Sequence, residues 1–280
     1  MAKGTIRPFT RLVDCRRAAN HMALALSLLL VSVAAKAQKE KASLISIGHV
    51  DILDTYLSQE KATGLELRYN KERLNRKFVG QSDSAGTGGM GMRKWSTFVS
   101  QEALLSKAGT RGNANSFLGA MYNLRFGWHY NMDRSTLNVR VGLLGDFMLG
   151  GIYNTRNSNN PAQLKLALSV DPSVMATWRF HVKGRPFALR YEASAPALGI
   201  AFSPNYGQSY YEIFTRGNYD HNVVFTSPAS GFQIQQQLLF DFRLWRTTFT
   251  IGYLNDIRQL SANSLKYHQY THAVTIGWRY

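Results

Sequence analysis

The sequence predicts an all-β chain that folds as an antiparallel transmembrane β-barrel of about 10 strands, within a range of about 8 to 12. Three observations favour this class. The last stretch, Tyr270 to Tyr280, alternates apolar and polar residues and ends on an aromatic side chain. A secretory signal precedes the mature chain. The Trp residues gather at one end of the predicted strands. Because strands cross a membrane only as closed barrels, a secreted chain of alternating strands is expected to form one.

The C-terminal strand has one apolar face, made by Tyr270, His272, Val274, Ile276, Trp278 and Tyr280. We expect lipid to cover this face in place of a second protein layer. An aromatic final residue on an alternating strand also resembles the assembly signal of bacterial outer-membrane barrels. The predicted partners are therefore the lipids of the outer membrane of a Gram-negative bacterium and, through Tyr270 to Tyr280, the barrel assembly machinery.

The N-terminal segment, residues 1–37, is predicted to be a signal peptide, and residues 38–280 are predicted to form a single barrel domain. Basic residues precede the apolar run Met22 to Val33, and Ala35-Lys36-Ala37 supplies a cleavage site. The run is shorter than the ~20 residues that a membrane helix needs. Translation could begin at Met1 or at Met22, and both starts leave the same mature chain.

Charge and cysteine content exclude several functions. The chain carries a net charge of +16, but its basic residues are scattered over turns and strand faces, so no nucleic-acid partner is expected. The single cysteine, Cys15, falls within the predicted signal peptide, which excludes disulfides and thiolate metal sites in the mature chain. The chain has no metal-ligand spacing and no phosphate loop, so neither a metal nor a cofactor is expected.

The first half of the mature chain supplies five predicted strands. The first is ambiguous in phase, because Leu44 and Ile45 would lie on opposite faces. A Gly/Ser-rich connector, expected to be mobile, spans Gln81 to Met92. From the fourth strand onward the period-two pattern is strong. These strands cover about Ser43 to Val50, Leu65 to Arg73, Trp95 to Leu105, Leu118 to Tyr130 and Leu137 to Leu149.

The second half supplies five more strands and a long interruption. Pro172 within the sixth strand predicts a bulge. A region from Pro196 to Ser230 breaks the pattern and is expected to be irregular. The remaining strands cover Leu164 to Phe180, Phe187 to Ala193, Phe232 to Asp241, Phe249 to Asp256 and Tyr270 to Tyr280.

Connection lengths set the predicted topology, because bacterial barrels have short periplasmic turns and longer extracellular loops. Thr155 to Pro161, Pro196 to Ser230 and Gln259 to Lys266 become the longer, extracellular connections. The periplasmic end then holds an aromatic belt of Trp95, Trp128, Trp178, Trp245 and Trp278. A soluble β-sandwich or a lipocalin-like barrel also alternates and is the structural alternative.

Two segments, Gly151 to Gln163 and Phe202 to Phe214, resemble the Bacteroidetes family of unknown function DUF3316. The resemblance extends over most of the mature chain. It implies a secreted, envelope-associated protein, and it supplies no catalytic residue.

The candidate ligand-binding residues lie at the predicted extracellular rim, where Tyr, Asn, Gln and Arg side chains suit a glycan or peptide ligand. The alternative is that they serve only turns and interface anchoring. If the long loop folds into the barrel mouth, Arg190, Glu192 and Gln233 are the expected partners of its tyrosines and of Glu212. The candidates are Tyr153, Asn154, Arg156, Tyr206, Gln208, Tyr210, Tyr211 and Glu212.

Two other functions remain open at this stage. A hydrolase acting on lipid or glycan would use His221 with Ser209, Ser227 or Asp220, although no recognised active-site spacing surrounds His221. A small diffusion channel would need an open lumen, whereas side chains can fill a small barrel. The expected lumen groups have mixed signs, which favours neutralising pairs: Glu66, Arg68, Arg125, Arg140, Asp146, Lys165, Asp171, Arg179, Arg190, Glu192 and Asp241.

Overall fold

The computed structural model describes residues 37–81, 89–157 and 160–280, and the alternating stretches of these residues form twelve antiparallel strands. The predicted signal peptide and the middle of the connector from Gln81 to Met92 lie outside the described residues. The strands are β1 (Ala37–Asp54), β2 (Ser58–Gln81), β3 (Gly89–Thr110), β4 (Ser116–Asp133), β5 (Leu137–Asn154), β6 (Ala162–Val182), β7 (Arg185–Ser194), β8 (Leu198–Phe202), β9 (Val223–Thr226), β10 (Ile234–Leu244), β11 (Thr247–Ala262) and β12 (Leu265–Arg279).

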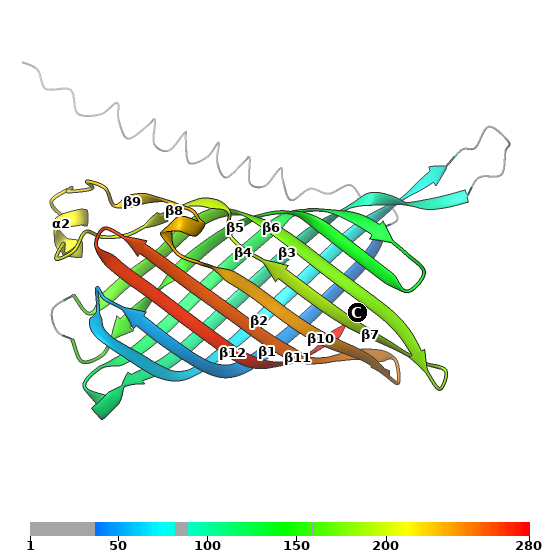
Figure 1. Ribbon diagram of the computed structural model, residues 1–280, viewed down its shortest axis with the longest axis horizontal. Helices are drawn as coiled ribbons and strands as arrows, with labels where there is room; N and C mark the ends of the chain where they lie inside the picture. Colours follow the sequence, from blue (N-terminus) through cyan, green and yellow to red (C-terminus); the bar gives the residue numbers. More distant parts are fainter. Residues whose placement is uncertain (1–36, 82–88, 158–159) are drawn as a thin grey trace, which may run out of the picture. The chain divides into compact units, whose positions relative to one another are not determined.

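The sheet closes on itself as a barrel of tilted strands (Figure 1). Each long strand pairs with the next along the chain, β10 pairs with β7, and β12 returns to β1. Ten strands make the ring, namely β1 to β7 and β10 to β12, so the predicted class and strand number are confirmed.

The prediction that Pro196 to Ser230 is irregular is partly wrong, because this region contains two short strands and two short helices. β8 extends the line of β7 along β6, because the N–H groups of Ala195 and Ala197 still donate to β6 on either side of Pro196, which has none. β9 pairs with β8, and the short helices α2 (Tyr210–Phe214) and η2 (Pro228–Ser230) complete the region.

Three further expectations need correction. The strands are longer than the period-two pattern indicated, and Gly89 to Met92 already belong to β3. The connection predicted from Gln259 to Lys266 is a two-residue turn, in which Asn263 and Ser264 have φ values of 53° and 61°. These values are typical of a tight hairpin turn. Pro172 causes no register shift between β5 and β6, since Leu143 pairs with it in the regular ladder.

Around the middle of the barrel, apolar side chains face outward and charged side chains face inward. Leu67 is 47% exposed, whereas the next residue, Arg68, is 1% exposed. A soluble β-sandwich would bury such leucines, so this inversion supports the membrane barrel over the soluble alternative. None of the described helices is long and apolar enough to cross a membrane.

The short turns at residues 134–136, 183–184 and 245–246 lie at one end of the barrel, which we assign to the periplasm. Trp95, Trp128, Trp178 and Trp278 lie near the strand ends on this side, and Trp245 lies in one of the turns. The chain's C-terminus is also at this end, whereas α2 and the β8–β9 connection are at the other (Figure 1).

Candidate functional site at the extracellular mouth

Ion pairs occupy the middle of the lumen. Arg68 donates to Glu66 over 3.0 Å, to Glu102 over 3.2 Å and to Asp256 over 2.8 Å. Closer to the periplasm, Arg190 binds Asp241 over 2.8 Å. Opposite charges in contact neutralise each other and replace lost hydration, so the predicted lumen pairs are present around Arg68 and Arg190. Asp146 and Asp171, which were also expected to pair, form no ion pair with the described residues.

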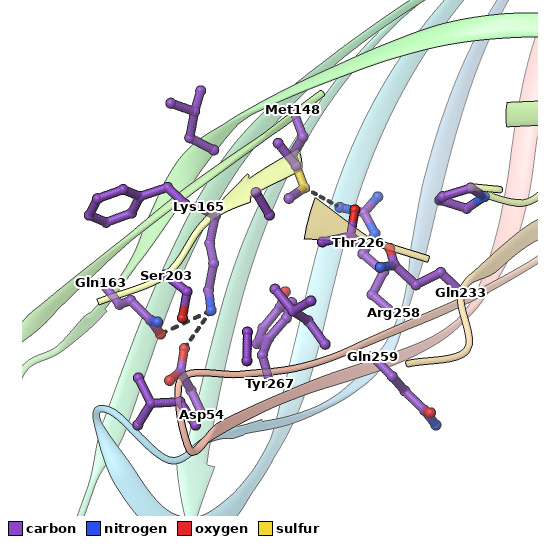
Figure 2. A pocket seen from close by; sticks show the side chains of 18 of the residues that line it. Asp54, Met148, Gln163, Lys165, Ser203, Thr226, Gln233, Arg258, Gln259 and Tyr267 are labelled. Carbon is purple, nitrogen blue, oxygen red and sulfur yellow. Dashed lines mark hydrogen bonds and ion pairs between the residues drawn. The ribbon is translucent and has the colours of Figure 1, made fainter. Parts of the chain in front are cut away.

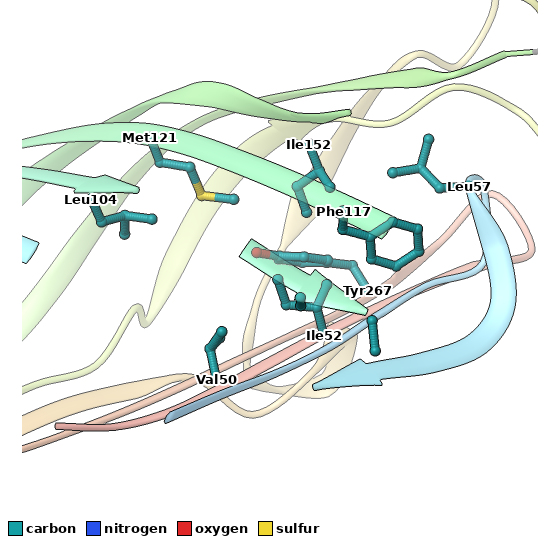
Figure 3. Packing of buried hydrophobic residues seen from close by; sticks show 10 residues of the cluster. Val50, Ile52, Leu57, Leu104, Phe117, Met121, Ile152 and Tyr267 are labelled. Carbon is teal, nitrogen blue, oxygen red and sulfur yellow. The ribbon is translucent and has the colours of Figure 1, made fainter. Parts of the chain in front are cut away.

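An apolar cluster lies nearer the extracellular strand ends than these ion pairs. Figure 3 shows how its side chains pack together. The cluster fills the lumen with side chains from the ends of several strands, and Leu57 adds the β1–β2 turn to it. Its buried members are Val50, Ile52, Leu57, Ala62, Leu104, Ala108, Phe117, Met121, Ile152 and Tyr267.

The long loop between β8 and β9 is anchored to the opposite side of the mouth. The Tyr56 hydroxyl donates to the Gln208 carbonyl over 3.0 Å. The Tyr56 and Tyr210 rings meet edge to face with centroids 5.8 Å apart. The Tyr210 hydroxyl accepts a 2.6 Å bond from the Leu164 N–H at the end of β6. Burial raises the pKa of Tyr56 to about 12 and also raises the pKa of Tyr210, because a phenolate is poorly solvated at these positions.

Gln208 and Glu212 organise the loop itself. The Gln208 amide accepts from Asn205 and Asn222 and donates to the Asn218 carbonyl, over 2.7–3.0 Å. Glu212 accepts from the Ser209 N–H over 2.8 Å, which completes a capping box at the start of α2. This backbone bond, with the bond from the Ser209 hydroxyl, lowers the pKa of Glu212.

The predicted ligand-binding residues divide into two groups. Tyr153, Tyr206 and Tyr211 are exposed by 48%, 70% and 60%, and Arg156 is exposed as well. The other four hold the mouth together: Asn154, Gln208, Tyr210 and Glu212.

The expected loop partners are wrong. Arg190 and Glu192 bind each other at 2.7 Å, deep in the lumen, and Gln233 lines the cavity beneath the loop. Tyr206 does not enter the mouth, whereas Tyr56 from the β1–β2 turn contacts the loop and was missed. An aromatic residue in a three-residue turn was the one signal that could have identified it.

The lumen cavities are small. The cavity beneath the loop has a volume of about 60 Å³ and lies beside Lys165, whose ammonium binds Asp54 at 2.8 Å and lies 3.5 Å from the Tyr267 ring centre (Figure 2). Another of about 60 Å³ and two of about 30 and 20 Å³ follow toward the periplasm. Such volumes suit a few water molecules. Within the described residues, these cavities do not amount to an open channel.

The histidine proposed for hydrolysis lies in the same loop but is highly exposed. His221 Nδ1 is 2.6 Å from Asp220, and their side chains are 79% and 75% exposed. Ser209 binds Glu212 in the cap of α2, and Ser227 is the residue before η2, where its backbone N–H donates to Ser230. No cluster of His, Cys, Asp or Glu suited to a metal occurs among the described residues.

A closed ring of ten antiparallel strands with lipid-facing apolar residues and a charged lumen defines the protein as an outer-membrane β-barrel. The transport unit of the Escherichia coli autotransporter AIDA-I is similar in fold: the TM-score is 0.52, the identity 8%, and the alignment covers 94% of this chain and 96% of that one.

Two other outer-membrane structures are more distant. For the E. coli protease OmpT the TM-score is 0.39 at 6% identity, with 89% and 98% of the two chains covered. For the translocator domain of the Neisseria meningitidis autotransporter NalP, the TM-score is 0.38 at 9% sequence identity, and the alignment covers 95% of this chain and 98% of that one. The sequence matches none of the curated proteins with which it was compared. The chain belongs to the family described as "Protein of unknown function (DUF3316)", whose model matches residues 22–279.

Proposed function

We propose that this barrel is a surface recognition protein, in which a filled lumen supports a rigid aromatic loop that binds a glycan or a peptide. The observation that carries the proposal is that the loop holds one tyrosine in a fixed position and leaves two others exposed. Tyr210 is fixed against Tyr56 and β6, while Tyr206 and Tyr211 remain exposed nearby. In this proposal Tyr210 holds the loop in place, and Tyr206 and Tyr211 form the binding surface.

The chemistry of the exposed group supports this role. Tyrosine rings offer flat apolar faces with a hydroxyl for hydrogen bonding, at low cost in side-chain entropy. Arg216 lies 5.6 Å from the Tyr211 ring centre, so a cation adjoins this face. A loop already ordered before binding loses less conformational entropy when a ligand arrives.

A glycan array and a displayed peptide library, probed with the purified protein in detergent, test the proposal. Binding should fall at least tenfold in Tyr206→Ala/Tyr211→Ala. The matched control is Trp245→Ala, which removes an 87% exposed aromatic from the periplasmic end. Equal binding by the double variant and the control, or no binding in either screen, would reject the recognition role. Steady conductance across planar bilayers would instead support the diffusion channel.

A further inference from the structure

Two acidic side chains face one small lumen cavity without a basic partner. Asp146 of β5 and Asp171 of β6 line the second cavity of about 60 Å³. Neither forms an ion pair with the described residues, and Asp146 Oδ1 is buried without a hydrogen-bond partner. Ser169, the register partner of Asp146, donates to Asp171 over 2.6 Å. A carboxylate held away from bulk water is costly unless a cation or a proton compensates its charge.

The arginines beside this cavity are already paired with other carboxylates. Arg125 lies opposite Asp146 in the β4–β5 register, but its guanidinium contacts Glu102 at 3.5 Å. Arg258 lines the cavity, but it binds Asp256 at 2.8 Å. The central network contains as many arginines as carboxylates: Arg68, Arg125 and Arg258 with Glu66, Glu102 and Asp256. The pair of carboxylates at the cavity therefore remains uncompensated.

A neutral oxygen faces the same cavity. Asn123 on β4 lines it and is only 5% exposed, and its Oδ1 is buried without a hydrogen-bond partner. The register places Asn123 diagonally across from Asp146, since its own partner is Met148. A buried amide oxygen that accepts no hydrogen bond is uncommon in folded proteins, and its partner would be a cation or a hydrogen-bond donor. This observation is independent of the carboxylates and points into the same cavity.

We propose that Asp146, Asp171 and Asn123 bind a calcium ion within the lumen. The described residues hold no metal cluster made of His, Cys, Asp or Glu alone, so the amide oxygen is an essential ligand. Calcium prefers carboxylate and amide oxygens and takes water molecules as its remaining ligands. A divalent ion cancels both uncompensated charges, and the cavity has room for an ion with a few waters. Magnesium fits less well, because it demands near-ideal octahedral geometry and gives up its own waters reluctantly.

The ion would join β4, β5 and β6 on the inside of the barrel. Met148 and Gln233 line both this cavity and the cavity beneath the loop, so the site adjoins the extracellular mouth (Figure 2). An ion that binds the folded barrel and not the unfolded chain stabilises the fold. The proposal is independent of the recognition role, because no residue of the β8–β9 loop supplies a ligand.

Thermal unfolding, followed by tryptophan fluorescence, tests the inference on barrel refolded in detergent without membrane lipids, whose phosphates also bind calcium. Saturating calcium chloride should raise the melting temperature of the wild type by about 3 °C over that in EGTA. Asp146→Asn/Asp171→Asn should abolish this shift. In EGTA this variant should be at least as stable as the wild type, because the uncompensated charges are gone. The matched control, Glu60→Gln/Asp220→Asn, removes the same charge from exposed positions and should keep the shift.

Isothermal titration calorimetry measures the binding directly. Wild-type barrel should bind calcium with a dissociation constant on the order of 0.1–1 mM, the range of extracellular calcium modules. Asn123→Leu removes an amide oxygen that has no other partner, and should weaken binding about tenfold without changing the melting temperature in EGTA. Wild-type affinity in Asn123→Leu, or an equal shift with magnesium chloride, would overturn the calcium site. The absence of any calcium-dependent shift in the wild type would also overturn it and would indicate that the two carboxylates share a proton.

Discussion

The Tyr56 hydroxyl donates a hydrogen bond to the backbone carbonyl of Gln208, across 152 residues of sequence and 3.0 Å of space. This bond links the β1–β2 turn to the longest extracellular loop, from opposite sides of the barrel mouth. It also connects the apolar cluster, which Tyr56 contacts from above, to the loop that carries the exposed tyrosines. Order at the rim therefore depends on a turn that is distant in sequence.

Loss of Tyr56 should free the loop. Tyr56→Phe removes one hydrogen bond, worth about 1 kcal/mol, and should speed tryptic cleavage at Arg216 about fivefold. Tyr56→Ala also removes the contact with the Tyr210 ring and should speed it further. Tyr206→Ala, which changes an exposed ring, is the control and should leave the rate unchanged. Rapid cleavage of the wild type at Arg216 would show that the loop is not held by Tyr56.

The ion pairs of Arg68 should stabilise the barrel strongly. Arg68→Met leaves Glu66, Glu102 and Asp256 buried with less positive charge, and the free energy of unfolding should fall by about 3–5 kcal/mol. Urea titration of tryptophan fluorescence in micelles measures this fall. Adding Glu66→Gln should recover part of it, because among the described residues Glu66 forms its ion pair with Arg68, whereas Glu102 keeps Arg125 and Arg258. Arg134→Met, in an exposed turn, is the control; a similar loss there would argue against a specific role of Arg68.

The C-terminal strand should control assembly. Tyr280 exchanges backbone hydrogen bonds with Lys41, at 3.0 and 3.1 Å, where the barrel closes. Deletion of Tyr280, or Trp278→Asp on the outer face, should lower the heat-modifiable fraction without reducing secretion. Semi-native gels of outer membranes measure that fraction, with Tyr219→Asp in the extracellular loop as the control. Full assembly of both variants would contradict the assembly role predicted for Tyr270 to Tyr280.

The cap of α2 should respond to acid. The folded-state pKa of Glu212 is lowered from 4.5, chiefly by the Ser209 N–H, so its stabilising effect is present above pH 4.5 and is lost as the pH falls through the lowered pKa. Hydrogen exchange of residues 209–216 should therefore lose protection in that acid range. Glu212→Gln should remove this pH dependence. Persistence of the same acid response in Glu212→Gln would assign it to another group.

Much of the barrel could be predicted because alternation is a local property. Leu67 and Arg68 point to opposite faces in any strand, and whether a face is apolar or polar depends on whether it meets lipid or the lumen. The phase of β1 was ambiguous, because Leu44 and Ile45 are both apolar. Pairing with β12 resolves it: Leu44 faces inward, where it packs against Leu239. The sequence pattern did not reveal that β8 continues β7 along β6. Pro196 interrupts the alternation of apolar and polar residues, but the backbone hydrogen bonds to β6 continue on both sides of it.

The sequence by itself determined the antiparallel membrane barrel, its strand number and the mixed charges of its lumen, since these depend on neighbours along the chain and on the solvent. Only the tertiary structure decided that Tyr210 packs at the mouth while Tyr206 and Tyr211 stay exposed. Which ring is held depends on the Tyr56 side chain and on the Leu164 N–H, which donates to Tyr210, and closure of the barrel brings these groups to the loop.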